Sequence, residues 1–192
     1  MAADQTWPRQ FVAKRAFFNF WGVRFRIFVD GQLAFFVKQK AFRLKEDITV
    51  YADETQTLPV LQIRARNIID FSATYDVSDP HTGQTVGALQ RKGVRSMLRD
   101  EWHVLDPTGA TLAVIQEESL ALAVLRRVLF NLIPQIFTVT QDSVWLGEMK
   151  QRFNPFLHVY DVDLRPTKNH ELNPRLGIAA AVLLLAIEGR QQ

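Results

Sequence analysis

The sequence predicts an all-β protein, a closed antiparallel barrel with a hydrophobic α-helix along its axis. Three observations lead to this fold class. Residues 174–190 near the C-terminus are apolar on nearly every face of a helix, so this segment has to be buried on all sides. Short strand-like runs joined by turn signals fill most of the remaining chain. These hairpins follow one another with few helical breaks, which favours an antiparallel sheet that closes on itself.

Length and composition limit the further choices. We expect the 192 residues to form one domain, 1–192, with an aromatic and basic leading segment at 1–22. The absence of cysteine excludes disulfides, thiol nucleophiles, cysteine-ligated zinc and S-acylation. A net charge of +3 gives no reason to expect a nucleic-acid partner. With neither a secretory signal nor a membrane-spanning run, we expect a cytoplasmic protein that is not transmembrane, with peripheral attachment to a membrane left open.

Aromatic and basic side chains are mixed at the start of the chain. Between residues 11 and 28, Lys14, Arg15, Arg24 and Arg26 are interleaved with seven rings. Such mixtures occur at membrane interfaces and on nucleic-acid stacking platforms. The alternation at residues 24–28 is also ordinary strand patterning. We therefore expect the rings to pack on the barrel and the four charges to point into water.

Turn and strand signals then alternate. Asp30-Gly31 separates two strand-like runs and predicts a type I′ hairpin turn, which requires positive φ at both central residues. In residues 60–66, apolar positions alternate with polar ones, as expected for a sheet with one dry and one solvated face. The predicted strands cover residues 24–29, 32–38, 42–45, 48–51, 60–66, 72–77, 85–91, 136–140, 143–153 and 157–163.

One hairpin pattern recurs along the chain. Residues 75–86 and 102–112 each contain an aromatic-led strand, an Asp-Pro turn with a glycine, and a second strand. Looser copies cover residues 137–149 and, around Asp53, residues 48–66. The repeating unit is one hairpin and its connection rather than the coil of a solenoid.

Two helices are predicted. Residues 119–130 carry leucines on one face and Arg126 and Arg127 on the other; this helix either closes an end of the barrel or lies on anionic lipid. The second helix starts at Asn173-Pro174, an N-cap followed by proline at the first helical position. At a rise of about 1.5 Å per residue it spans about 22 Å, less than the ~30 Å hydrocarbon core of a bilayer.

No motif for catalysis or metal binding is found, so we expect neither enzymatic activity nor a cofactor. A phosphate-binding loop, a nucleophile elbow and histidines at metal-ligand spacing are all missing from the sequence. His103 and His158 lie on predicted strands, where we expect hydrogen-bonded structural histidines. Neighbouring acids point to opposite faces of a strand and make poor acid/base couples. We expect both such pairs, Asp100-Glu101 and Glu117-Glu118, to be solvated at the surface.

Three stretches resemble the LURP-one-related branch of the tubby C-terminal-like superfamily. They are Phe36–Phe42, Glu118–Arg127, and Arg152–Phe156 followed by the helix from Leu176 to Arg190. The likeness extends from about residue 33 onward. It implies a barrel of about 12 strands around a buried helix. It also points to two kinds of relative: tubby domains, which bind phosphoinositide headgroups through basic residues on the barrel, and phospholipid scramblases, which are membrane-associated.

This resemblance favours a non-enzymatic module that binds phospholipid headgroups at a membrane surface. A protein-interaction scaffold that uses the N-terminal aromatic segment is the alternative, and a scramblase-like lipid-handling protein is a third. The helix fills the lumen, so a site should lie on the outer wall or at a mouth of the barrel. The phosphoinositide-binding residues of tubby map to no particular position here. The candidates for headgroup binding are therefore generic basic residues: Lys38, Lys40, Arg91, Lys92, Arg95, Arg99, Arg126 and Arg127.

Overall fold

The computed structural model describes residues 7–16, 23–39, 47–69, 72–92, 100–118, 134–154 and 157–188. Within them, twelve strands and one helix are found: β1 (Gln10–Ala16), β2 (Val23–Val29), β3 (Gln32–Gln39), β4 (Ile48–Tyr51), β5 (Pro59–Ile69), β6 (Ser72–Ser78), β7 (Thr85–Arg91), β8 (Glu101–Leu105), β9 (Thr111–Glu117), β10 (Ile136–Gln141), β11 (Val144–Arg152), β12 (Leu157–Leu164) and α2 (Pro174–Glu188). The predicted strand at 42–45 and the predicted helix at 119–130 lie outside the described residues.

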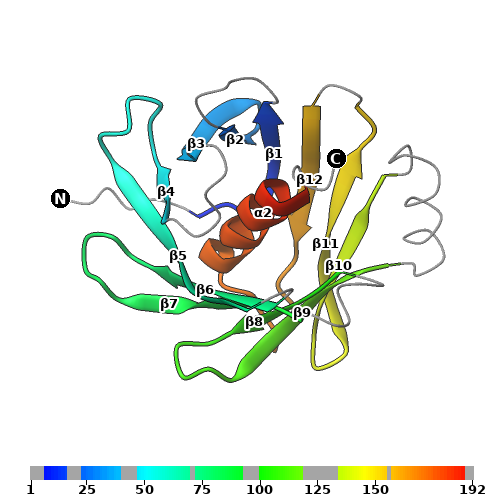
Figure 1. The fold of residues 1–192 in the computed structure, drawn as a ribbon. Helices are drawn as coiled ribbons and strands as arrows, with labels where there is room; N and C mark the ends of the chain where they lie inside the picture. Colours follow the sequence, from blue (N-terminus) through cyan, green and yellow to red (C-terminus); the bar gives the residue numbers. More distant parts are fainter. Residues whose placement is uncertain are drawn as a thin grey trace.

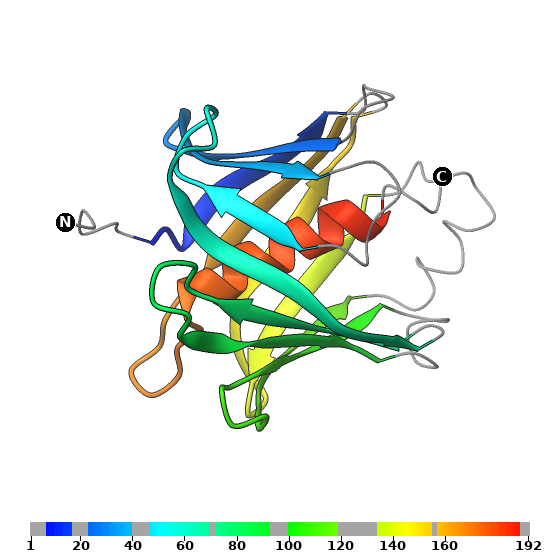
Figure 2. The same cartoon turned by 60° about the vertical axis from the view of Figure 1, so that its left-hand side comes forward.

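The strands form a closed antiparallel barrel. Each strand pairs with its neighbours in the sequence, and β1 closes the sheet against β12. Helix α2 runs through the interior, with strands on every side of it (Figure 1, Figure 2). The predicted fold class, an all-β barrel around a C-terminal helix, is confirmed.

Helix α2 is the core of the molecule. All its residues from Leu176 to Ile187 are buried, as the absence of polar side chains over this segment predicts. The amide of Arg175 donates to Oδ1 of Asn173 at 3.0 Å, so Asn173 is the predicted N-cap and Pro174 opens the helix. Because the helix takes up the lumen, ligand binding is left to the outer wall and the two ends of the barrel.

Two glycines permit close backbone approach around this core. A Cβ added at Gly147 on β11, where φ is 151°, would overlap the backbone oxygen of Asp163 on the neighbouring strand. A Cβ at Gly177 would overlap the side chain of Leu164, which packs on the helix. A larger residue at position 147 would therefore push β11 away from β12, and one at position 177 would push β12 away from the helix.

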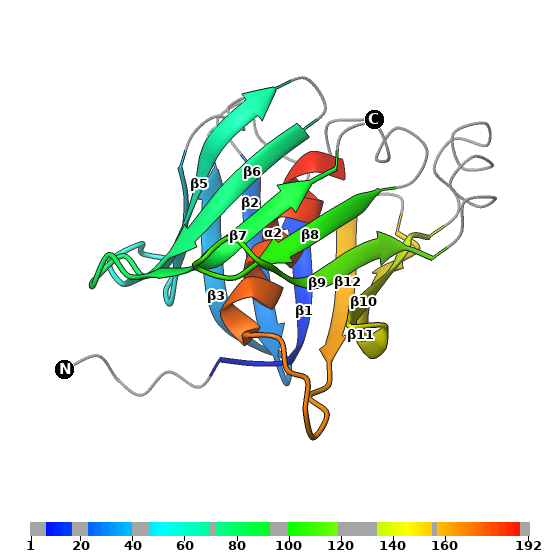
Figure 3. The same ribbon diagram turned by 90° about the horizontal axis from the view of Figure 1, so that it is seen from below.

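The two ends of the barrel differ. At the N-cap end, where α2 begins, five short hairpin turns join the strands, and each turn contains an aspartate: Asp30, Asp53, Asp79, Asp106 and Asp142. At the opposite end, which we call the C-cap end, α2 finishes at Glu188. Figure 3 shows the two ends of the helix at opposite ends of the barrel.

The aspartates shape the turns at the N-cap end. Asp30 and Gly31 have φ angles of 49° and 79°, which confirms the predicted positive φ at both positions. The carboxylate of Asp53 accepts hydrogen bonds from the hydroxyls of Thr55 and Thr57 and from backbone amides of the same turn. These bonds stabilise the charged form and hold the pKa of Asp53 well below its ordinary value.

Part of the leading segment closes the N-cap end. The ring of Trp7 stacks on Phe35 with centroids 5.2 Å apart, and the guanidinium of Arg175 lies 4.9 Å from the centre of the Trp7 ring. Arg9 donates from Nη1 to the carbonyl of Leu172 at 3.1 Å. These contacts fix the start of β1 against the start of α2. The described aromatic residues at the start of the chain thus pack on the barrel, as predicted.

Candidate functional site

A group of basic side chains lies on the outer wall of β1, β2 and β3. The strand registers place Lys14 directly opposite Arg26 and Arg24 directly opposite Lys38. Side chains directly opposite each other in an antiparallel pair have Cβ atoms about 5 Å apart, and alternate residues of a strand are about 7 Å apart. Four cations therefore share one small area, which we call the basic face: Lys14, Arg24, Arg26 and Lys38.

The strand alternation explains why these four side chains point outward. On β2, Phe25 and Ile27 are fully buried against the helix, so Arg24 and Arg26 must lie on the other side of the sheet. Arg24 and Lys38 are exposed, whereas Lys14 and Arg26 are half-buried. The face belongs to the barrel wall and not to a loop, so the Cα atoms that carry its cations are held at fixed spacing.

Aromatic rings lie among these cations. The ammonium group of Lys14 is 4.6 Å from the centre of the Phe28 ring, and the guanidinium of Arg26 is 5.8 Å from that of Phe36. Phe36 points outward yet is only 4% exposed. The aliphatic stems of such long basic side chains can cover apolar surface while their charged ends stay in water. The predicted mixture of rings and cations is thus present on one wall of the barrel.

The charges of the basic face are only partly balanced. Arg26 forms an ion pair with Glu54 across a nitrogen–oxygen distance of 2.5 Å. Among the residues that the structure describes, no carboxylate lies within ion-pair distance of Lys14, Arg24 or Lys38. Directly opposed like charges destabilise a sheet. At about 6 Å in water each such pair costs about 0.7 kcal/mol by Coulomb's law.

Only some of the headgroup candidates fall within the described residues. Lys38 belongs to the basic face. Arg91 points into the barrel, where Nη2 is 2.7 Å from Oδ1 of Asp100, and Lys92 donates to Oε1 of Gln90 on the outer side of β7. Strands β4 to β6 separate Lys38 from Lys92, so these candidates do not share a surface. Lys40, Arg95, Arg99, Arg126 and Arg127 lie outside the described residues.

Arg15 corrects one prediction. It was expected in water with the other cations at the start of the chain, but it is only 6% exposed and faces the interior, on the same side of β1 as Phe11 and Ala13. Its Nη1 donates to the carbonyl of Leu185 at 2.9 Å. Leu185 lies in the last turn of α2, at the negative end of the helix dipole. The carbonyl acceptor at this end makes the buried position of the Arg15 cation tolerable.

Further polar side chains line the interior beside Arg15, at the C-cap end. His158, which is directly opposite Arg15, has Nδ1 3.2 Å from Nε2 of Gln151. The hydroxyl of Tyr160 donates to Oε1 of Gln135 at 2.7 Å, and the amide of Gln135 donates to Oε1 of Gln151 at 3.1 Å. His158 is hydrogen-bonded, as predicted for a structural histidine. This network lies at the same end of the barrel as the last turn of the helix, which Arg15 contacts.

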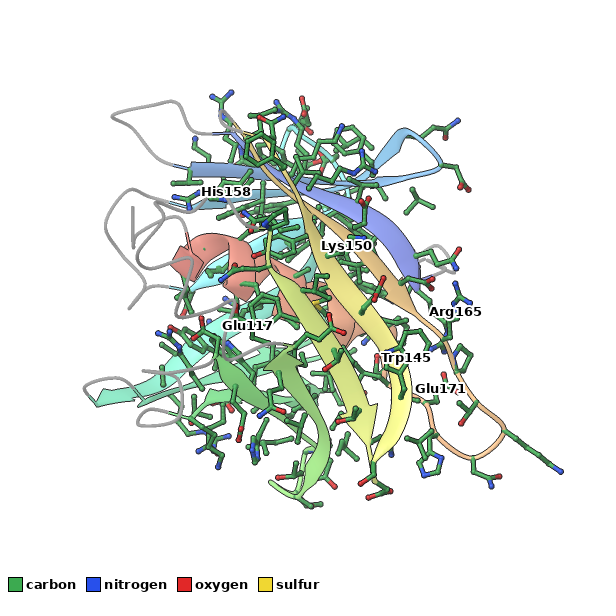
Figure 4. The ribbon with its side chains drawn as sticks, turned by 90° about the vertical axis from the view of Figure 1, so that its right-hand side faces the viewer. Glu117, Trp145, Lys150, His158, Arg165 and Glu171 are labelled. Atoms are coloured by element: carbon green, nitrogen blue, oxygen red, sulfur yellow. The ribbon has the colours of Figure 1, made fainter. Side chains whose placement is uncertain are left out.

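The two acidic pairs also need a correction, because three of the four residues are not solvated. Asp100, Glu101 and Glu117 are all less than 10% exposed, whereas Glu118 is exposed as expected. Asp100 is buried because its partner Arg91 enters the same interior edge of the barrel. Figure 4 shows Glu117 and His158 towards the C-cap end, and Trp145, Arg165 and Glu171 towards the N-cap end.

Glu101 lies on the outer side of β8 and is buried in a small hydrogen-bond network. It accepts from Nε2 of Gln116 at 2.9 Å, and its other oxygen is 3.0 Å from Nε2 of His103. His103 is thus hydrogen-bonded, as predicted. Thr111 Oγ1 lies 3.5 Å from His103 Nδ1, which is long for a hydrogen bond. This arrangement therefore does not pair a nucleophile with a base.

The described part of the chain contains neither a candidate metal site nor a candidate membrane-spanning helix. No group of three or more histidine or acidic side chains there could hold a metal ion. No helix there has the length and apolar character needed to cross a bilayer.

The comparison with protein families gives one match. The model of the LURP-one-related family matches residues 33–184, which include most of the barrel and most of α2. Comparison with curated proteins and with solved structures gives no match.

Proposed function

The chain belongs to the LURP-one-related family of the tubby-like superfamily, and from this premise we propose that it is a non-enzymatic module that binds anionic phospholipid headgroups through the basic face. One observation carries the proposal: Lys14, Arg24 and Lys38 lie side by side on three strands without a carboxylate partner among the described residues. Bringing these cations together is unfavourable in the free protein. A bound anion between them would relieve that repulsion.

The chemistry of the face suits a lipid surface. Each lysine or arginine near an anionic leaflet contributes about 1 kcal/mol of attraction. Phe28, which is only partly buried, adds an apolar ring beside the ammonium group of Lys14. Headgroup phosphates are therefore a better match to this surface than a neutral ligand.

The alternative, a scaffold that uses the N-terminal aromatic segment, has less support. The described rings of that segment contact the barrel itself: Phe11 is buried in the core and Trp7 stacks on Phe35. These two side chains are already occupied. We therefore prefer headgroup binding, which places the protein at the periphery of a membrane.

Co-sedimentation with vesicles tests the proposal. Vesicles of phosphatidylcholine alone are compared with vesicles that also contain phosphatidylserine, over a range of salt concentrations. The double variant Lys14→Gln/Lys38→Gln should lose about 2 kcal/mol of binding to the anionic vesicles, or about 30-fold in affinity. Its matched control is Lys92→Gln/Lys168→Gln, which removes the same charge elsewhere on the barrel and should change affinity less than about 3-fold.

Three results would contradict headgroup binding by this face. The first two are failure of the wild-type protein to sediment with either kind of vesicle, and equal sedimentation with both. The third is a loss of affinity in the control variant as large as that in the basic-face variant, which would show that net charge alone matters. The expected binding weakens as salt rises, because exposed charges are screened within about 10 Å at 0.1 M ionic strength.

A further inference from the structure

Two exposed apolar side chains border the basic face at the C-cap end. Phe153, directly after β11, is 63% exposed and is the most exposed of the large hydrophobic residues in the described part of the chain. Leu157, which opens β12, is 36% exposed. They flank the tip of the same hairpin, so an apolar edge lies where two adjacent strands meet that end.

The strand registers connect this edge to the basic face. Leu157 lies opposite Ala16 of β1, Ala16 lies opposite Arg24 of β2, and Arg24 lies opposite Lys38 of β3. One row across four neighbouring strands thus runs from an apolar residue at one side to two cations at the other. Phe153 comes one residue beyond this hairpin's last β11 position.

The hairpin turns at the opposite end of the barrel are rich in aspartate. Each of the five turns at the N-cap end contains one, and none of the five is buried. Asp79 is paired there with Arg175, at 3.4 Å between Oδ2 and Nη1. An anionic surface repels the exposed aspartates and attracts the basic face, which lies in the half of the wall nearer the C-cap end. These charges favour an orientation with the C-cap end towards an anionic membrane.

We propose that Phe153 and Leu157 insert into the interfacial region of an anionic bilayer while the basic face contacts the headgroups. This inference rests on the proposed headgroup binding and adds the orientation of the barrel. An apolar edge beside a cationic surface is the arrangement by which peripheral proteins bind the headgroup–acyl boundary, with apolar burial and electrostatic attraction acting together. Contact with phosphates determines which wall of the barrel faces the membrane, and insertion of the two side chains determines the tilt of the barrel.

The cysteine-free chain allows a direct test. A Phe153→Cys variant and a Leu58→Cys variant are each labelled with an environment-sensitive fluorophore. Leu58 is the matched control, because it is 56% exposed in a turn at the N-cap end. With phosphatidylserine-containing vesicles, the label at position 153 should shift to the blue, brighten several-fold and become protected from an aqueous quencher. The label at position 58 should not change.

A second variant separates insertion from headgroup contact. Phe153→Ala should bind anionic vesicles about 10-fold more weakly. This is the effect expected when a phenylalanine ring that is mostly buried in the bilayer is removed. Its affinity for inositol hexakisphosphate, a soluble polyphosphate that offers nothing to insert into, should be unchanged.

The outcomes distinguish the two proposals. Salt-sensitive vesicle binding with a fully quenchable label at position 153 overturns insertion and leaves headgroup binding in place. A shift at position 58 instead of 153 overturns the orientation. Failure of the wild-type protein to bind anionic vesicles overturns both proposals. A spectral shift at position 153 that depends on protein concentration, without vesicles, assigns this edge to a contact between copies and overturns insertion.

Discussion

Replacing Arg15 with methionine should destabilise the protein by about 3 kcal/mol. Methionine retains an unbranched apolar stem and so fills much of the same space on the inner side of β1. It removes the donor that lies 2.9 Å from the carbonyl of Leu185, and Leu185 is completely buried. The carbonyl of Leu185 then loses its charged donor.

The magnitude follows from two contributions. Losing a hydrogen bond from a charged donor costs about 1.5–3 kcal/mol. Removing a partly buried cation from the C-terminal end of a helix costs up to about 2 kcal/mol. Relief from the desolvation of the arginine offsets a part of this sum, which leaves about 3 kcal/mol. For a protein of this size, such a loss corresponds to a fall in Tm of about 6–12 °C.

Urea unfolding followed by circular dichroism measures the effect, with Lys14→Met as the control. Lys14 is the neighbouring residue on the same strand and points to the outer wall, so its replacement should change the free energy of unfolding by less than about 0.5 kcal/mol. If the two variants were equally stable, Arg15 would contribute nothing through the helix terminus, and the explanation for its burial would be wrong.

Three further predictions concern the fold. Gly147→Ala should cost about 3 kcal/mol or more in urea unfolding, because the added Cβ overlaps the backbone of the neighbouring strand, whereas Gly83→Ala, with φ of 71° but open space around it, should cost about 1 kcal/mol. Leu183→Ala, inside the barrel, should cost about 3–4 kcal/mol by the same measurement, and Leu58→Ala at the surface almost nothing. Asp53→Asn should lower Tm at neutral pH, and the difference from the wild-type protein should shrink as pH falls below about 4. The lowered pKa of Asp53 makes its contribution present above the unfolded-state pKa and lost as pH falls through the folded-state pKa; a gap that stayed constant to low pH would contradict this assignment.

Local rules were sufficient for the parts of the fold that depend on neighbours in the sequence. The start of α2 could be predicted from Asn173 and Pro174, because the N-cap bond joins residues two apart. The Asp30-Gly31 turn was predictable because its φ angles belong to the residues themselves. The barrel followed from the helix, since a segment buried on all sides needs strands around it.

The buried polar residues could not be predicted, because their partners are distant in the sequence. Arg15 shares a face of β1 with Phe11 and Ala13, and this alternation was the one signal in the sequence that Arg15 faces the interior. A buried arginine is rare unless it is paired, and its acceptor on Leu185 lies 170 residues away. Asp100 likewise becomes an interior residue only through the register that brings Arg91 to the same edge of the barrel.

The basic face was predictable in part. The alternation around Arg24 and Arg26 correctly placed both side chains on the solvated side of a strand. Their meeting with Lys14 and Lys38 depends on two cross-strand registers, which no local pattern specifies. The sequence therefore suggested Lys38 as a headgroup candidate but did not group it with Lys14, Arg24 and Arg26, which lie near it on the barrel.

Because inward and outward residues alternate along β2, the basic face can be changed without changing the core. Shifting β2 by one residue would move Phe25 and Ile27 into water and drive Arg24 and Arg26 into the core, so the fold itself fixes which side the cations occupy. In the native register the charged ends of the arginines face outward, and changing them leaves the buried side of the strand untouched. Neutral replacements on this wall should therefore weaken binding to anionic vesicles while Tm stays constant or rises slightly, because like-charge repulsion is removed. A fall in stability that matched the fall in binding would mean that the cations serve the barrel and not a ligand.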